Sequence, residues 1–194
     1  MGVICSSDPQ KPISPSTALT WLTQLNSDWA AHKQPVSLSV GFVWAGHSVP
    51  QRDVLQHCRE AEKRAKSLGR DRVTIKVLFN SGQYVQWTCP WSYLDILTKY
   101  RDRNGKTWGD PKLNWTHLYN DWAELKARHA IRLQDRSNQV DDRIALKIFE
   151  LYFDDMKRFE NQSQEIFKQD YTPKAVIEWL DGLVNVGWQL CSNT

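Results

Sequence analysis

The feature that most constrains the fold is a pair of alternating segments separated by one amphipathic helix. In residues 36–42, apolar side chains alternate with serines and a glycine, and residues 73–80 show the same period of two. Such alternation is typical of strands. Between the two segments, residues 48–69 place apolar and small side chains at helical spacing and end at Gly69, a common helix terminator. The order predicts a sheet that carries a helix.

The alternation also divides the side chains of the second segment into two sets. Val73, Ile75 and Val77 fall on one face of the predicted strand and are expected to point inward. Thr74 and Lys76 fall on the other face and are expected to point outward. This pattern predicts a strand with one buried and one solvated face.

Further elements extend this unit at both ends. Residues 1–5 are predicted to form a strand, and a helix capped by Ser14 follows a proline-rich connector. After residue 80 the chain is predicted to turn back through Gly82, and a short helix covers about residues 91–100. The order predicts an α/β (α+β) sheet with helices on one face. About three strands are near the lower limit for independent stability, so we expect an incomplete sheet.

The second half of the chain is patterned differently. We place a linker loop at residues 101–113, between a domain at residues 1–100 and a domain at residues 114–194. The second domain shows only helical spacing and is predicted to be a small all-α helical bundle. Three amphipathic helices are predicted there. The first carries its inward-facing residues from Trp115 to His129, the second carries apolar side chains from Val140 to Phe159, and the third begins at Thr172.

Composition excludes several classes of protein. No stretch is long and apolar enough to span a membrane, and no signal peptide is visible, so we expect a cytoplasmic protein with no membrane partner. The four cysteines lie far apart and form no paired metal-ligand spacing with the histidines, which predicts reduced thiols rather than zinc. The opening MGVICSS also matches the N-myristoylation pattern, although we favour the strand.

Charge is spread unevenly along the chain. The net charge is only +3, yet residues 50–113 carry 13 basic and 7 acidic side chains, whereas residues 114–194 carry 10 basic and 13 acidic ones. The middle of the chain is therefore the part that could attract an anion. Ten tryptophans are many for 194 residues and indicate well-packed cores or contact surfaces.

A specific resemblance is carried by the strand at residues 36–42 and the helix that follows it. The run SVGFVWAG, followed by a helix ending REAEKRAKSLGRDRV, is similar to the second half of a palm domain of the GGDEF and nucleotidyl-cyclase kind. That family has Ser-x-Gly in a strand and Ala-Lys-x-x-Gly-Arg-x-x-Val at the end of the following helix. The matching positions here are Ser39, Gly41, Ala65, Lys66, Gly69, Arg70 and Val73.

The run from this motif into a helical C-terminal region most resembles one branch, the large subunit of type III CRISPR effector complexes. The resemblance implies a partial ferredoxin-like palm followed by a helical domain, in a protein of antiviral defence. Its implied partners are the upstream half of the large subunit, other effector subunits, and guide and target RNA. Its implied cofactors are ATP as substrate with Mg or Mn, bound only in the completed palm.

The sequence departs from that branch at the catalytic turn. The Gly-Gly-Asp-Asp turn, which would hold the metal ions, does not occur in these 194 residues. Two-metal nucleotidyl transfer needs neighbouring acidic ligands, and the adjacent acids here, such as Asp141 and Asp142, are expected to point apart on helices. We therefore expect no catalytic residue and no metal ligand in this chain, and no activity from it alone.

Lys66 and Arg70 are the predicted substrate-binding residues. Spacing alone favours solvated cations near a helix C-terminus, where the helix dipole stabilises positive charge. The resemblance implies instead that they contact nucleotide phosphates, because the matching residues of the family do so. Arginine is suited to this by its fork of donors and lysine by its mobile charge.

Two other basic stretches are candidates for nucleic-acid contact. The loop KYRDRNGKTWGDPK mixes cations with Trp108, although a solvated interdomain loop explains it as well. The run LKARHAIRLQDR is predicted to place a basic stripe along one helix, for a nucleic acid or an acidic subunit. The candidate contacts are Arg101, Arg103, Lys106, Trp108, Arg128 and Arg132.

Three functions remain open at this point. The first is a part of the large subunit that contributes to the ATP-binding palm. The second is a separately translated, small-subunit-like protein that binds RNA or neighbouring subunits through its helices without catalysis. The third, a complete cyclase-like enzyme, is disfavoured by the missing carboxylates.

Overall fold

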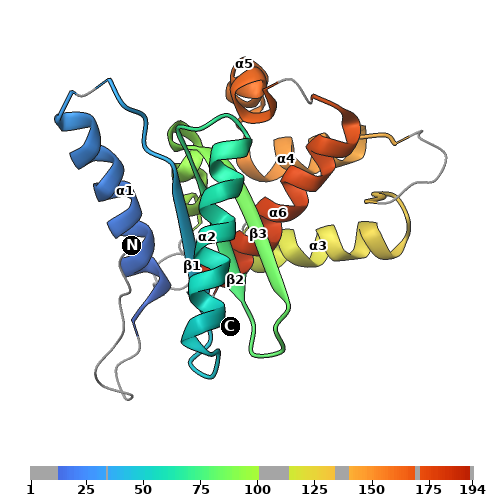
Figure 1. The fold of residues 1–194 in the computed structure, drawn as a ribbon. Helices are drawn as coiled ribbons and strands as arrows, with labels where there is room; N and C mark the ends of the chain where they lie inside the picture. The colour runs from blue at the N-terminus through green and yellow to red at the C-terminus, as the bar shows by residue number, and fades with distance from the viewer. Residues whose placement is uncertain (1–12, 34, 101–113, 134–139, 169–170, 193–194) are drawn as a thin grey trace.

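The computed structural model describes residues 13–33, 35–100, 114–133, 140–168 and 171–192. These residues form a mixed α/β fold in which a sheet lies among helices (Figure 1). In chain order the elements are α1 (Pro15–Ala31), β1 (Val40–Ala45), α2 (Gln51–Ser67), β2 (Arg72–Leu78), β3 (Tyr84–Pro90), the 3-10 helix η1 (Trp91–Thr98), α3 (Trp115–Ala127), α4 (Arg143–Phe153), α5 (Met156–Phe167) and α6 (Pro173–Cys191).

The sheet has three strands in the order β1-β2-β3. The two strands predicted from alternation are neighbours: β1 pairs with β2 in parallel, with Val40 opposite Val73. A parallel pair needs a crossover, and α2 supplies it. The predicted turn at Gly82 is confirmed: Gly82 adopts a φ of 79°, and β3 returns antiparallel to β2. The predicted strand at residues 1–5 lies outside the described residues.

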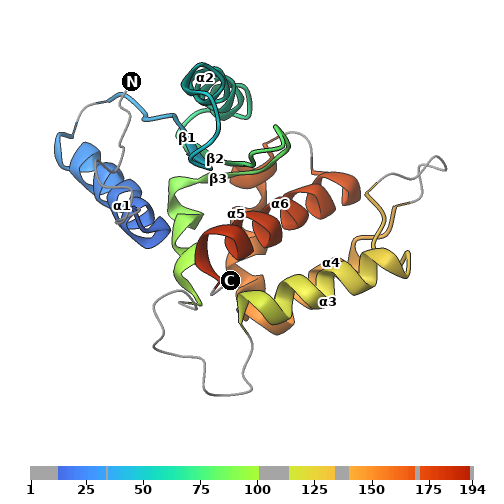
Figure 2. The same ribbon diagram turned by 90° about the horizontal axis from the view of Figure 1, so that it is seen from below.

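Helices cover both faces of the sheet, whereas the sequence predicted helices on one face only. Figure 2 shows α2 on one side of the strands and α6 on the other. Each helix approaches the sheet through a glycine. A methyl group on Gly41 of β1 would collide with the backbone of α2 at Cys58 and Glu62, and one on Gly182 of α6 would collide with Gln86 of β3. The sheet is therefore the middle layer of three.

One continuous core joins the sheet to the C-terminal helices. Trp179 of α6 contacts both parts of this core, and its Nε1 donates to the carbonyl oxygen of Thr88 at 2.9 Å. The Trp179 ring centroid lies 5.4 Å from that of Trp87 and 5.5 Å from that of Tyr93. Further rings from the helices surround it, those of Phe149, Phe159 and Phe167. Many of the tryptophan side chains are therefore part of the core. The predicted domain boundary at residues 101–113 lies outside the described ranges.

The helix ends follow local chemistry closely. Ser14 caps α1 and Thr172 caps α6 with side-chain oxygens, each followed by proline, so the two predicted starts are confirmed. The single helix predicted across Val140–Phe159 is wrong: α4 ends at Phe153 and α5 begins at Met156. Asp154 between them adopts a left-handed φ of 50°, which ends α4.

Candidate functional site

The turn that follows α2 has an unusual backbone. Gly69, Arg70 and Asp71 adopt positive φ values in succession, 116°, 61° and 51°. Few non-glycine residues adopt such values without support. Support comes from two hydrogen bonds: the Arg70 N–H donates to the Ala65 carbonyl oxygen at 3.2 Å, and the Asp71 N–H donates to the Ser39 Oγ at 3.2 Å. The second bond ties the turn to the residue before β1.

The buried side chain of Arg72 also supports this turn. Its side chain is almost fully buried, and its Nε donates to the Arg70 carbonyl oxygen at 3.0 Å. Its other nitrogens donate to carbonyl oxygens at the end of α5, to Ile166 at 3.1 Å and to Glu165 at 2.8 Å. The guanidinium therefore connects the α2–β2 turn to a helix more than 90 residues away in sequence.

Lys66 and Arg70 both lie at this end of α2 and both are exposed. Lys66 Nζ is 2.6 Å from Glu62 Oε1, one helical turn earlier, an arrangement that also occurs on solvated helix surfaces. The structure adds a lysine that sequence reasoning missed, because the side-chain carbons of Lys168 pack over Gly69. Nothing in the local sequence indicates this neighbour, because only the tertiary fold brings Lys168, the residue that ends α5, next to Gly69.

A second polar cluster lies between α2 and the sheet. Lys76 was predicted to point outward into solvent, and that prediction is wrong: α2 covers the face, and the side chain is 4% exposed. Its Nζ lies 3.0 Å from Glu60 Oε2, 3.4 Å from His57 Nδ1 and 4.4 Å from the centre of the Tyr84 ring. The hydrogen bond from Lys76 lowers the pKa of the Glu60 carboxyl group below its ordinary value.

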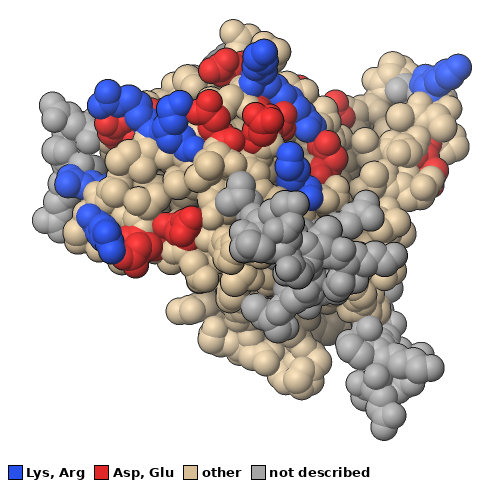
Figure 3. Space-filling view, turned by 180° about the vertical axis from the view of Figure 1, so that it is seen from behind, with Lys and Arg blue, Asp and Glu red and all other residues tan. Residues whose placement is uncertain are grey.

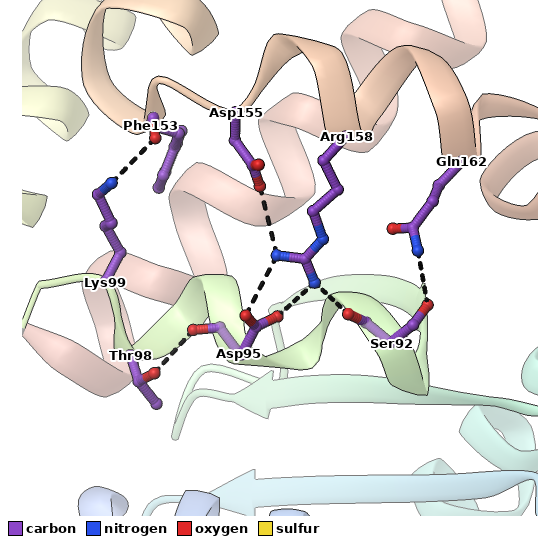
Figure 4. A network of polar contacts seen from close by, with 8 residues as sticks. All are labelled: Ser92, Asp95, Thr98, Lys99, Phe153, Asp155, Arg158 and Gln162. Atoms are coloured by element: carbon purple, nitrogen blue, oxygen red, sulfur yellow. Dashed lines mark hydrogen bonds and ion pairs between the residues drawn. The ribbon is translucent and has the colours of Figure 1, made fainter.

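A third cluster joins η1 to α5 (Figure 4). The Arg158 guanidinium donates to both oxygens of Asp95, at 2.6 and 3.1 Å, to Asp155 at 3.4 Å and to the carbonyl oxygen of Ser92. It also lies 4.4 Å from the centre of the Tyr93 ring. The guanidinium nitrogens of Arg158 thus have several acceptors at once. These bonds connect η1 to α5, two elements that are far apart in the sequence.

A hollow of about 350 Å³ lies beside Arg158, between η1 and the α4–α5 corner. Its charged lining is mixed, with Asp95, Asp154 and Asp155 near two cations, Lys99 and Arg158. Lys99 is also engaged, since its Nζ donates to the carbonyl oxygen of Phe153 at 3.0 Å (Figure 4). Because acids and bases neutralise one another here, we interpret the cluster as a structural clamp rather than a catalytic centre.

The other candidate contacts are spread over the chain. Arg101, Arg103, Lys106 and Trp108 lie outside the described residues. The predicted basic stripe on one helix is wrong because α3 ends at Ala127. Arg128 caps that helix and pairs with Glu124 at 2.6 Å, and Arg132 donates to the carbonyl oxygen of His129 at 3.3 Å. On the side seen in Figure 3, basic and acidic side chains alternate rather than forming a field of one sign.

Within the described ranges, no group of three or more His, Cys, Asp or Glu side chains is arranged to hold a metal ion. None of the helices in those ranges has both the length and the apolarity that a membrane crossing requires. Comparison of the chain with models of known protein families and with curated proteins gives no match.

Proposed function

We propose that this chain is the C-terminal part of a type III CRISPR effector large subunit. In that role it works in antiviral defence within an RNA-guided ribonucleoprotein and contributes part of an ATP-binding palm for cyclic oligoadenylate synthesis. The observation that carries the proposal is the convergence of the motif residues on one end of the strand–helix–strand unit. Ser39 is bonded to the turn after α2, Gly41 lies under α2, and Gly69 takes a positive φ.

The chemistry assigned to this end of α2 is phosphate binding. Lys66 and Arg70 would offset the negative charge of the nucleotide phosphates. The carboxylates that hold Mg or Mn would come from the upstream half of the palm, because the described residues offer no such group. The chain by itself is therefore expected to make no oligoadenylate from ATP and a divalent metal.

The strand order supports a missing half. Among the described residues β1 pairs only with β2, so its second edge has no strand beside it. Edge strands are commonly protected by charges, prolines or bulges. The sequence of β1, VGFVWA, has no charge and no proline, and its register with β2 is continuous. Such an edge suits a strand supplied by the other half of a palm, whose binding would extend the sheet.

The test is reconstitution with the upstream half and the remaining subunits. In the assembled complex, Lys66→Ala/Arg70→Ala should weaken ATP affinity by about tenfold or more, the scale of losing hydrogen bonds to charged groups, and should slow oligoadenylate formation. The matched control is Arg52→Ala/Arg59→Ala, which removes two exposed cations from the other part of α2. Equal ATP affinity in all three complexes would return Lys66 and Arg70 to the role of a solvated helix end.

The second candidate, a small-subunit-like protein without catalysis, is favoured by a different observation. Lys66 already has a carboxylate partner in Glu62 at 2.6 Å, which leaves its ammonium group less available to a nucleotide phosphate. The same reconstitution separates the two functions. A chain that joins the complex and contributes to RNA binding, but whose presence leaves ATP affinity unchanged, would support the second candidate.

A further inference from the structure

Helix α4 carries exposed apolar side chains beside the ones that it buries in the core. Its buried side, which includes Ala145, Phe149 and Tyr152, faces the rest of the protein. Beside that side runs a row that we call the apolar stripe: Ile144, Ile148 and Leu151. Spacings of four and three place these residues on one line along the helix. Ile144 is 41% exposed and Leu151 is 58% exposed, while Ile148 is partly buried. Ile148 packs against the core, and Ile144 and Leu151 leave aliphatic side chains exposed on either side of it, which suggests a contact surface.

The flank of this row is charged in an ordered way. A second row, which we call the charge stripe, runs along the adjoining side of α4 and continues into the residue that ends the helix. It consists of Arg143, Lys147, Glu150 and Asp154. The basic residues occupy the N-terminal half and the acidic residues the C-terminal half. The stripe thus has one sign at each end, and its midpoint lies close to Ile148, the middle of the apolar stripe.

The pattern of charges on one α4 is complementary to that on a second α4 that runs in the opposite direction. If two copies of α4 lie antiparallel, the basic half of each charge stripe faces the acidic half of the other. The two apolar stripes then meet about the same centre. This is the requirement of an interface with twofold symmetry, in which one patch serves both partners. Antiparallel alignment also sets the two helix dipoles in opposite directions.

From this geometry we propose that α4 is a self-association surface, and that its occupant is the α4 of a second copy of this chain, packed antiparallel. The charge stripe is already paired within the chain, Arg143 with Asp141 at 2.8 Å and Lys147 with Glu150 at 2.5 Å. Exposed pairs of this kind contribute little, so they can rearrange across an interface at small cost. Three aliphatic side chains per copy make a small contact, so the dimer is weak and concentration-dependent. The inference does not depend on the function proposed above.

Sedimentation equilibrium of the full chain tests the surface. Up to about 0.5 mM, the range that detects weak complexes, the average mass should rise from 22.6 kDa toward twice that value. Leu151→Asp should raise the dissociation constant by roughly a hundredfold or more, because symmetry removes the leucine from both sides of the contact. Val36→Asp changes another exposed apolar residue outside α4 and should leave the constant unchanged.

Charge reversal gives a test that does not depend on how well Leu151→Asp folds. Lys147→Glu makes the centre of the charge stripe wholly acidic, and Glu150→Lys makes it wholly basic. Each variant alone should associate at least about tenfold more weakly than the wild type, through like-charge contacts. A mixture of the two variants should form a heterodimer at least as readily as the wild type forms its dimer. A monomeric wild-type chain throughout the range, or variants that do not associate when mixed, would overturn the proposal.

Discussion

At the scale of single residues, the sheet shows how far alternation in a sequence can be trusted. The period of two in β2 correctly separates Val73, Ile75 and Val77 from Thr74 and Lys76. It does not reveal that α2 covers the second set, since that depends on how the crossover helix lies. Lys76 is therefore buried, and its surroundings compensate: a carboxylate, an imidazole and an aromatic ring. A buried ammonium without such partners would be costly.

The first prediction concerns the carboxylate of that cluster. Glu60→Gln should lower the free energy of unfolding by about 1 kcal/mol at neutral pH, because the buried Lys76 ammonium keeps only a neutral partner, while water screens the half-exposed Glu60 side chain. Chemical denaturation followed by circular dichroism measures the change. Glu62→Gln, which alters the exposed pair with Lys66, should cost no more than about 0.5 kcal/mol. If the two variants lose the same free energy of unfolding, then burial of Lys76 does not strengthen its ion pair with Glu60.

The same carboxylate has a signature in pH. The pKa of Glu60 in the folded protein is lowered, so the stability it contributes is present above its ordinary pKa of 4.5 and is lost as pH falls through the folded value. Between neutral pH and this acidic range, wild-type stability should decline more than that of Glu60→Gln. Unfolding curves collected across the range measure the difference, and parallel declines in both proteins would contradict it.

Gly41 is the residue on which the close approach of α2 depends. Gly41→Ala should destabilise the protein by roughly 3 kcal/mol, because the added methyl group meets the helix backbone at Cys58 and Glu62, which cannot rotate away. Gly46→Ala is the control: the atoms nearest to its new methyl group belong to the exposed side chain of Asn80, which can turn away. Thermal unfolding compares the two. If Gly41→Ala is as stable as the control, then α2 is not held on the sheet as described.

At the scale of elements, the sequence predicts that a helix exists and where it begins better than it predicts where the helix ends. The capped starts of α1 and α6 are set by local chemistry, a hydroxyl side chain followed by proline. The break between α4 and α5 is not visible in the same way, because apolar spacing continues across Asp154 and Asp155. The end of α3 at Ala127 was missed for a related reason: the following basic residues are compatible with a longer helix.

The position of α5 depends on a clamp that no local pattern predicts. Arg158 and Asp95 are 63 residues apart, and only the fold brings them together. Arg158→Lys should cost about 1–2 kcal/mol of stability although the charge is kept, because an ammonium cannot reproduce the fork of contacts to Asp95, Asp155 and Ser92. Lys157→Arg, at the neighbouring exposed position, is the control. Amide exchange in α5 should rise in the first variant and stay unchanged in the second.

At the scale of the whole molecule, the sheet and the C-terminal helices share one core. Gly182 lets α6 pack against the backbone of β3, and Trp179 bonds to that strand directly. The sequence indicated a change of pattern after residue 100, but a change of pattern does not reveal whether two halves pack together. The phosphate-facing role of Lys66 and Arg70 likewise stays a prediction, since it depends on a partner half.

This shared core leads to a prediction about fragments. Residues 1–100 produced alone should lack a cooperative unfolding transition and should bind an apolar dye, because the face that α6 covers, which includes Trp87, would be open to water. The full chain, measured in parallel, should unfold cooperatively. A fragment with a sharp transition and no dye binding would show that the sheet is stable without α6.

The contact between Trp87 and Trp179 gives the molecule an optical property. Two indole rings 5.4 Å apart and inclined at 54° are close enough for their electronic transitions to couple. One ring belongs to β3 and the other to α6, so the resulting signed couplet in circular dichroism would depend on the docking of the helix against the strand. A loosened state that kept its helices but lost this docking would retain the helical signal and lose the couplet. The protein thus contains its own chromophore pair for following how its two halves come together.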